Sequence, residues 1–399
     1  MSMKISHQSK VEVNLSIQKE GEDFTVGDPV REIFIRVPVE AIEIINLLDG
    51  KHSIEMIEKI LIEQKEIEID VLDFVNSLKR LKLIFRVDGI EWYSLEGKGS
   101  NKYLLALSNV FFNKKVIYLY CLFPIFCLIM LILSPQLLPS YTDFFLFNNI
   151  GLNMLVFFSI SWILTFFHEL SHYLAALKAG ANVKFRLSLR LYWLVVEADM
   201  TSLWGQEKKK RYVPFLGGIF WDFFALFISF CLQFILLEQS IFYGISRLIG
   251  IIVFLKLGMH LFLFIKTDLY YVFINYKNIP NLHYTSRVFL SKFIGSKESR
   301  IFWTEIPDEE KRVVKWFSVL YVIGVFVSIF MLLFYQLPIM YVAIQRSVYA
   351  VTQYSFLSWG FLDGFFALLI MFVEGAIWLI GAYTVYSSKV GSKEQKESL

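Results

Sequence analysis

The residues best able to do chemistry lie in one otherwise apolar stretch, positions 161–180, which reads SWILTFFHELSHYLAALKAG. His168, Glu169 and His172 form the pattern H-E-x-x-H in it. Residues four positions apart on a helix share a face, so the two imidazoles can bind one metal ion with the glutamate beside it as a general base. The chain has only six histidines, and two of them fall in this pattern. We therefore expect a zinc site here rather than two packing histidines.

A catalytic zinc ion usually has three protein ligands, so a third donor must come from elsewhere in the chain. Asp268, in the stretch HLFLFIKTDLYY, follows another apolar run and is expected at about the same depth as the first two ligands. A surface pairing with Lys266 is the alternative for this carboxylate. Glu197 and Asp199 are further possible ligands, although they lie in a segment with strand-like alternation.

The composition indicates that these residues lie in a membrane protein. Of the 399 residues, 56% are hydrophobic, whereas soluble domains are typically about 45–50% apolar. The net charge of +3 indicates no particular charged partner. The three cysteines lie in apolar runs without the spacing of a zinc or disulfide framework, so we expect reduced packing residues.

Six apolar runs are each long enough to cross a bilayer, which takes about 20 residues. The predicted spans are 116–138, 147–177, 212–237, 243–265, 313–335 and 356–386. Lysine and arginine gather in alternate loops, which by the positive-inside rule places both termini in the cytoplasm. The sequence thus predicts a multi-pass protein of a bacterial cell membrane, with H-E-x-x-H towards the cytoplasmic face.

The residues before the spans predict a small α+β domain of the winged-helix type at 20–97. The segment EIFIRV predicts a strand, helices are expected to begin at Pro38, Ser53 and Asp70, and Asp88-Gly89 predicts a hairpin. This order, with LLDGKHSIEMI, resembles the PqqD-like domains that recognise leader peptides of ribosomally made, modified peptides. The resemblance implies peptide capture, and an inert docking domain is the alternative. No dense basic recognition helix is present, so no nucleic acid is expected as a partner.

H-E-x-x-H in a membrane helix with a later aspartate resembles the site-2 protease family of intramembrane zinc metalloproteases. The family's second motif reads N-x-x-P-x-x-x-x-D-G, and the resemblance makes Asp268 the third zinc ligand. Aligned on that residue, His260 stands at the Asn position, Leu263 at the Pro and Leu269 at the Gly. The missing Pro and Gly leave open whether the helix breaks before Asp268. The segment FLGGIFWDFF resembles the small-residue helix start that the family places beside its site.

His260 admits three interpretations at the sequence level. By the resemblance, it replaces an asparagine that hydrogen-bonds near the zinc, and an imidazole can also stabilise negative charge in a transition state. It could instead be a fourth ligand that closes the site, or a packing histidine. If the helix continues to Asp268, the eight-residue separation puts the two residues on one face.

Together these observations predict a transmembrane metalloprotease domain at 110–388 and a solvated tail at 389–399. Glu169 and His260 are the expected catalytic residues, and His168, His172 and Asp268 the expected zinc ligands. The segment KFRLSLRLYWLVV predicts an edge strand or hairpin that could hold an extended substrate, or else a plain loop. The expected substrate is a precursor peptide, with the N-terminal domain capturing its leader. The alternatives are a catalytically silent peptide-binding, export or immunity component, and a protease that cleaves a membrane regulator.

Overall fold

The structure is a computed structural model, and it describes residues 5–92, 101–181, 183–190, 193–295 and 297–397. The chain divides into two compact units, which are described separately. The first comprises Met1–Asn113, Tyr173–Lys184 and Asp199–Pro214, and the second comprises Lys114–His172, Phe185–Ala198 and Phe215–Leu399.

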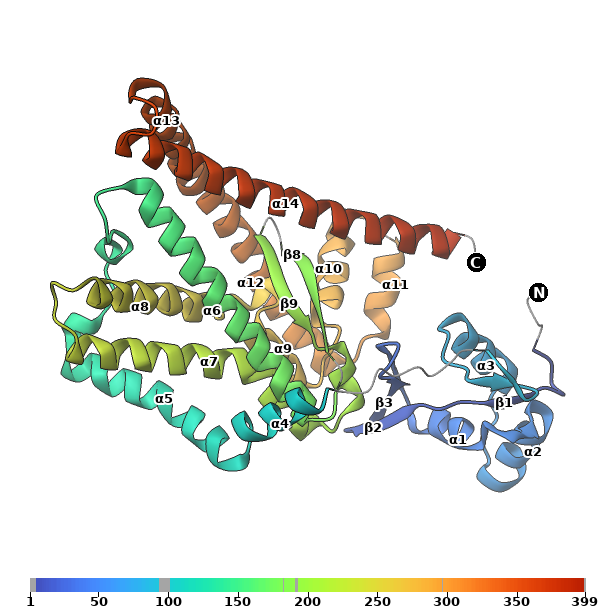
Figure 1. Cartoon of the computed structure of the whole chain (residues 1–399). Coiled ribbons are helices and arrows are strands. Elements are labelled where there is room, and N and C mark those ends of the chain that lie inside the picture. The colour runs from blue at the N-terminus through green and yellow to red at the C-terminus, as the bar shows by residue number, and fades with distance from the viewer. Residues whose placement is uncertain (1–4, 93–100, 182, 191–192, 296, 398–399) are drawn as a thin grey trace. The chain divides into compact units, whose positions relative to one another are not determined.

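Two small antiparallel sheets and three short helices form the N-terminal part of the first unit (Figure 1). One sheet has the strand order β5-β1-β6-β7, and the other has the order β2-β3-β4. Their elements are β1 (Lys10–Glu12), β2 (Ser16–Glu20), β3 (Asp23–Asp28), β4 (Ile33–Val37), α1 (Val39–Leu47), β5 (Asp49–Ser53), α2 (Ile54–Lys65), α3 (Val71–Arg80), β6 (Arg86–Val87) and β7 (Ile90–Glu91). This region contains more strands than the sequence predicted, and β1 precedes the predicted start at residue 20.

The predicted local signals are confirmed in this region. The Ser53 hydroxyl accepts a hydrogen bond from the first turn of α2 at 3.3 Å, and Asp70 caps α3 at 2.8 Å. Asp88 and Gly89 both have positive φ, at 51° and 79°, as a type I′ hairpin turn requires. Apolar side chains from α1, α2, α3 and the first sheet pack together in one hydrophobic core.

The second sheet of this unit packs on a 3₁₀ turn, η3 (Thr201–Gly205), that precedes the third apolar helix. The side chain of Gln18 donates to the carbonyl of Gly205 at 3.0 Å. A Cβ on Gly205 would lie 3.0 Å from Pro29 and 3.2 Å from Phe34, so the turn approaches the sheet as closely as glycine allows. The same unit contains α4 (Lys102–Phe111).

Within the residues that the structure describes, six helices are long and apolar enough to cross a membrane, which confirms the predicted number. They are α5 (Lys114–Leu133), α6 (Ile150–Lys178), α7 (Lys208–Ile235), α8 (Ile241–Met259), α12 (Asp308–Met331) and α14 (Trp359–Glu397). The other elements of the second unit are η1 (Pro135–Leu137), η2 (Tyr141–Phe144), β8 (Lys184–Arg190), β9 (Trp193–Asp199), η4 (Leu263–Ile265), α9 (Asp268–Lys277), α10 (Leu282–Ser291), η5 (Lys292–Ile294), α11 (Lys297–Glu305), η6 (Leu332–Gln336) and α13 (Leu337–Gln353).

Helix α7 is the central helix of the second unit. Half of the residues in its most apolar stretch are buried, whereas a third or less are buried in the corresponding stretch of each of the other five helices. Leu226 and Phe230 of α7 meet Cys127 of α5, Leu164 of α6 and Val253 of α8 in one apolar cluster. Side chains on α7 can therefore face several helices at once.

The fourth apolar helix ends earlier than predicted. The sequence predicted a span to residue 265, but α8 ends at Met259 and a new helix, α9, begins at Asp268. Lys266 adopts a left-handed conformation with φ 58°, and the Thr267 hydroxyl donates to the carbonyl of His260 at 2.8 Å. The sequence left open whether the helix breaks before Asp268, and the structure shows that it does, so His260 and Asp268 do not share one continuous helix.

Two other intramembrane carboxylates join α14 to α6. Asp363 accepts hydrogen bonds from the backbone of Gly151 at 2.6 Å and of Ile150 at 3.2 Å, so it caps the start of α6. Glu374 accepts a bond from the indole of Trp162 at 3.1 Å. Both carboxylates are therefore polar contacts between helices.

Candidate metal centre

Three of the predicted ligands meet at one point in the second unit. His168 and His172 extend from α6, and Asp268 is the first residue of α9. Their donor atoms form a nearly equilateral triangle. His168 Nε2 and His172 Nε2 are 3.2 Å apart, and each lies 3.1 Å from Asp268 Oδ2. Ligand atoms around a tetrahedral ion at about 2.0–2.1 Å lie about 3.3 Å apart, so this donor set fits one small metal ion.

Both histidines are almost fully buried, and Asp268 is largely so. Burial alone would raise the pKa of Asp268, but the positive charge that the adjacent histidines can carry outweighs burial and holds that pKa well below its usual range. A carboxylate oxygen 3.1 Å from both imidazoles has the position that an anionic metal ligand requires.

Two glycines of α7 create the space in front of these donor atoms. A Cβ on Gly218 would overlap His168 Cε1, His168 Nε2 and His172 Nε2, so a larger residue would fill the space where the donors converge. A Cβ on Gly217 would lie 3.2 Å from the backbone of His172, and the Ser171 hydroxyl donates to the Gly217 carbonyl at 2.7 Å. The GG pair thus sets the close approach of α6 and α7.

A fully buried carboxylate supports His168 from behind. Asp222, one turn after Gly218 on α7, places Oδ2 2.9 Å from His168 Nδ1. Its other oxygen, Oδ1, accepts from the Lys256 ammonium at 3.3 Å. Neither residue was among the predicted ligands or catalytic residues, because each is a single charged residue in an apolar run.

His260 lies beside the ligands and is not one of the three converging donors. Its ring is nearly parallel to that of His168, with centroids 5.5 Å apart. Its Nε2 is 3.5 Å from Asp222 Oδ2, and its Nδ1 is 3.6 Å from Asp268 Oδ2. Both ring nitrogens are buried and make no hydrogen bond to the described residues. The same atoms allow a second possible donor group of His168, Asp222 and His260.

Glu169 lies next to the converging donors, with Oε1 3.9 Å from His168 Nε2. Its Oε2 accepts a hydrogen bond from the backbone N–H of Ala198 on β9 at 2.7 Å. Strands β8 and β9 form the predicted two-stranded hairpin, and Arg186 bonds Glu197 across it at 2.9 Å. The backbone of β9 is thus in direct contact with the expected general base.

The alternative third ligands do not join this cluster. Glu197 is engaged by Arg186, as just described. Asp199 accepts from the backbone and the hydroxyl of Thr201, at 3.1 and 2.6 Å. Asp268, which the family resemblance selected, is the carboxylate that completes the triangle.

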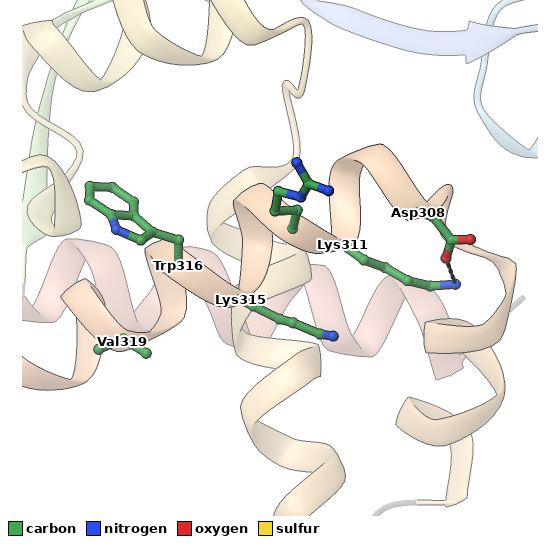
Figure 2. Close-up of a pocket in the computed structure, with 6 residues that line it drawn as sticks. Asp308, Lys311, Lys315, Trp316 and Val319 are labelled. Atoms are coloured by element: carbon green, nitrogen blue, oxygen red, sulfur yellow. Dashed lines mark hydrogen bonds and ion pairs between the residues drawn. The ribbon is translucent and has the colours of Figure 1, made fainter.

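An open pocket elsewhere in the second unit involves none of these residues. It runs along the first turns of α12 and is lined by Lys311, Arg312, Lys315, Trp316, Val319 and Asp308, with Lys311 and Asp308 paired at 3.0 Å (Figure 2). Its lysines and arginine lie at the start of an apolar helix, where basic residues are common in membrane proteins.

In comparisons with known proteins, no family model, no curated protein and no solved structure matches the chain.

Proposed function

We propose that the protein is an intramembrane zinc metallopeptidase of the site-2 protease type. The observation that carries this proposal is the triangle of His168 Nε2, His172 Nε2 and Asp268 Oδ2, with Glu169 at its side. Two histidines and one carboxylate are a common ligand set of catalytic zinc, and they leave a fourth position for water or substrate.

A zinc ion held by these three residues would lower the pKa of a water molecule and polarise the carbonyl of a peptide bond. Glu169 is the general base in this proposal. Its carboxylate takes the proton as the water oxygen attacks the carbonyl carbon, and delivers it to the nitrogen when the C–N bond breaks. The 2.7 Å bond from Ala198 orients Glu169 and leaves its Oε1 facing the ligands.

His260 is proposed as a hydrogen-bond donor to the substrate oxygen. The two buried nitrogens make no hydrogen bond to the described residues and lie 3.5 and 3.6 Å from carboxylate oxygens, so they keep the capacity to bond a further polar group. That capacity favours this role over simple packing. The fourth-ligand alternative is disfavoured because, among the described residues, His168, His172 and Asp268 form one possible metal-binding group that does not include His260.

Strand β9 is proposed to hold the substrate in an extended form. The Ala198 N–H is used by Glu169, so at this residue β9 directs its backbone away from β8 and towards the base. In an antiparallel pair every second residue has this orientation, so Val196 presents its backbone at the same edge. A substrate strand added there would run directly to Glu169.

The substrate proposed is a precursor peptide, with its leader bound by the N-terminal sheets. The distribution of basic residues supports cytoplasmic termini and a site near the cytoplasmic face, where water has a short path. If the chain instead were a silent peptide-binding component, purified protein would contain no zinc, or His260 would complete a closed four-ligand sphere.

Glu169→Gln tests the proposal most directly. We expect the variant to keep zinc at the wild-type ratio and to cleave a co-expressed precursor peptide at least about 10³-fold more slowly, because general-base loss removes the proton acceptor. Asp268→Ala should lose zinc as well as cleavage. Metal analysis and mass spectrometry of the peptide provide the readouts, and Glu374→Gln is the matched intramembrane control. Undiminished cleavage by Glu169→Gln would remove this residue from the mechanism.

A further inference from the structure

We propose that Asp222 is a positioning residue of the metal centre, which fixes His168 for metal binding, and that Lys256 balances its charge. This inference rests on the proposed metal binding by His168, His172 and Asp268. It adds two residues from α7 and α8 that touch neither the ion nor the substrate.

The contact between Asp222 and His168 selects the ring nitrogen that faces the ligands. A neutral imidazole carries one proton, and a carboxylate oxygen 2.9 Å from Nδ1 accepts that proton as a hydrogen bond. Nε2 is then left with its lone pair directed at the point shared with His172 and Asp268. Without the carboxylate, the ring could rotate or carry its proton on Nε2, and either change would oppose metal binding.

Lys256 compensates the negative charge of the buried Asp222 carboxylate inside an apolar helix bundle. Asp222 is fully buried, and an isolated charge in such surroundings is costly. Each carboxylate oxygen has its own partner: Oδ2 faces His168, and Oδ1 accepts a hydrogen bond from the Lys256 ammonium at 3.3 Å. Neither partner therefore displaces the other.

The formal charges of the cluster support the same assignment. Asp222, Asp268 and Glu169 carry three negative charges, and Lys256 carries one positive charge. With neutral histidines, one divalent cation at the triangle brings the sum to zero, which is the state a buried site favours.

The second possible donor group, His168 with Asp222 and His260, is better explained as support than as another metal site. The Lys256 ammonium lies 3.3 Å from Asp222, so a second cation bound to this carboxylate would face a positive charge at short range. His168 would also have to lose its Nδ1 proton. We therefore assign Asp222 to orientation of one ligand.

The test is the metal affinity of Asp222→Asn, measured by chelator competition with the full chain in detergent. We expect zinc to bind about 10–100-fold more weakly, the range typical for loss of an outer carboxylate partner. The visible spectrum of the cobalt-substituted protein should change as well, because the orientation of His168 changes. Asp363→Asn, a membrane carboxylate that caps α6 away from the site, is the control and should bind zinc normally.

The double variant Asp222→Asn/Lys256→Met keeps the test usable if Asp222→Asn folds poorly, because it also removes the unpaired ammonium. It should bind zinc as weakly as the single variant. Zinc affinity within about twofold of wild type in either variant would overturn this inference alone. A wild-type protein that binds no zinc would overturn the proposed function together with it.

Discussion

Two buried ionic clusters, one in each compact unit, use their charges in different ways. In the first unit, Glu20 meets Arg211 at 2.5 Å, and both side chains are almost completely buried. The guanidinium also donates to the carbonyls of Gln206 and Trp204, at 2.8 and 3.1 Å, and lies over the Trp204 ring. In the second unit, by contrast, three acceptor atoms crowd one point at 3.1–3.2 Å.

The difference separates a structural pair from a candidate metal site. One acid and one base that face each other neutralise their charges without help, and the arrangement is complete. Ligand atoms that converge on one point leave a position that a cation can occupy. Burial and charge are similar in the two clusters, so they do not single out the candidate metal site, whereas the direction of the ligand atoms does.

The largest effect is expected from filling the point where the donors converge. Gly218→Ala should abolish zinc binding, since its Cβ would overlap ring atoms of both histidines. Gly258→Ala on α8 is the matched control, because a Cβ there has nothing within 4 Å, and it should bind zinc normally. Metal content per mole of purified protein decides the comparison. Normal zinc in Gly218→Ala would mean that the ion, if any, lies elsewhere.

An intermediate effect is expected from breaking the structural pair. Glu20→Gln leaves the Arg211 guanidinium buried without its counter-charge, which should lower the free energy of unfolding of this unit by about 3–5 kcal/mol. Hydrogen exchange of β2, β3 and η3 should rise, while the zinc content stays constant. Glu22→Gln, at an exposed neighbouring position, should change neither quantity. Zinc loss in Glu20→Gln would contradict the distinction between the clusters.

The smallest effect concerns His283 of α10, a largely buried ionisable group that packs edge-on against Tyr321. Burial lowers its pKa to about 4, and the positive charges of Lys266 and Arg287 act in the same direction. Between pH 6.5 and 4 the unfolded chain therefore binds a proton that the folded chain does not. Stability from this group is complete above about pH 6.5 and declines as the pH falls through that window.

His283→Asn should accordingly reduce the loss of thermal stability between pH 7.5 and pH 5. The difference from wild type should be about 2 °C in Tm, as befits a partly exposed side chain. Thermal unfolding of both proteins in detergent at the two pH values gives the comparison, with His7→Asn as an exposed-histidine control. Equal pH-dependent losses in wild type and His283→Asn would show that another group dominates.

Local signals in the sequence predicted local structure well. The spacing of His168 and His172, the caps at Ser53 and Asp70, and six apolar runs each depend on neighbouring residues. The short strands β1 and β5 were missed because KVE and DGKHS lack a period-2 apolar pattern. Pairing with the rest of the sheet makes them strands.

The residues that support His168 lie on other helices, so no single segment of the sequence encodes this part of the site. Asp222 and His168 are 54 positions apart, and Lys256 belongs to a third helix. Sequence reasoning could mark a carboxylate in an apolar helix as costly, but not which side chain it would meet. The triangle itself needed the family resemblance to choose Asp268 over Glu197 and Asp199.

The helix break before Asp268 affects how sequences with the same arrangement of residues can be recognised. The turn from α8 to α9 forms without the proline and the glycine of the motif N-x-x-P-x-x-x-x-D-G. Lys266 adopts the left-handed conformation, and the Thr267 hydroxyl donates to the carbonyl of His260. More than one sequence can thus encode a helix break at this position. A genome search that demands a fixed Pro and Gly would pass over this sequence. A query that combines H-E-x-x-H with a Thr-Asp pair at the end of a later apolar helix would retrieve it.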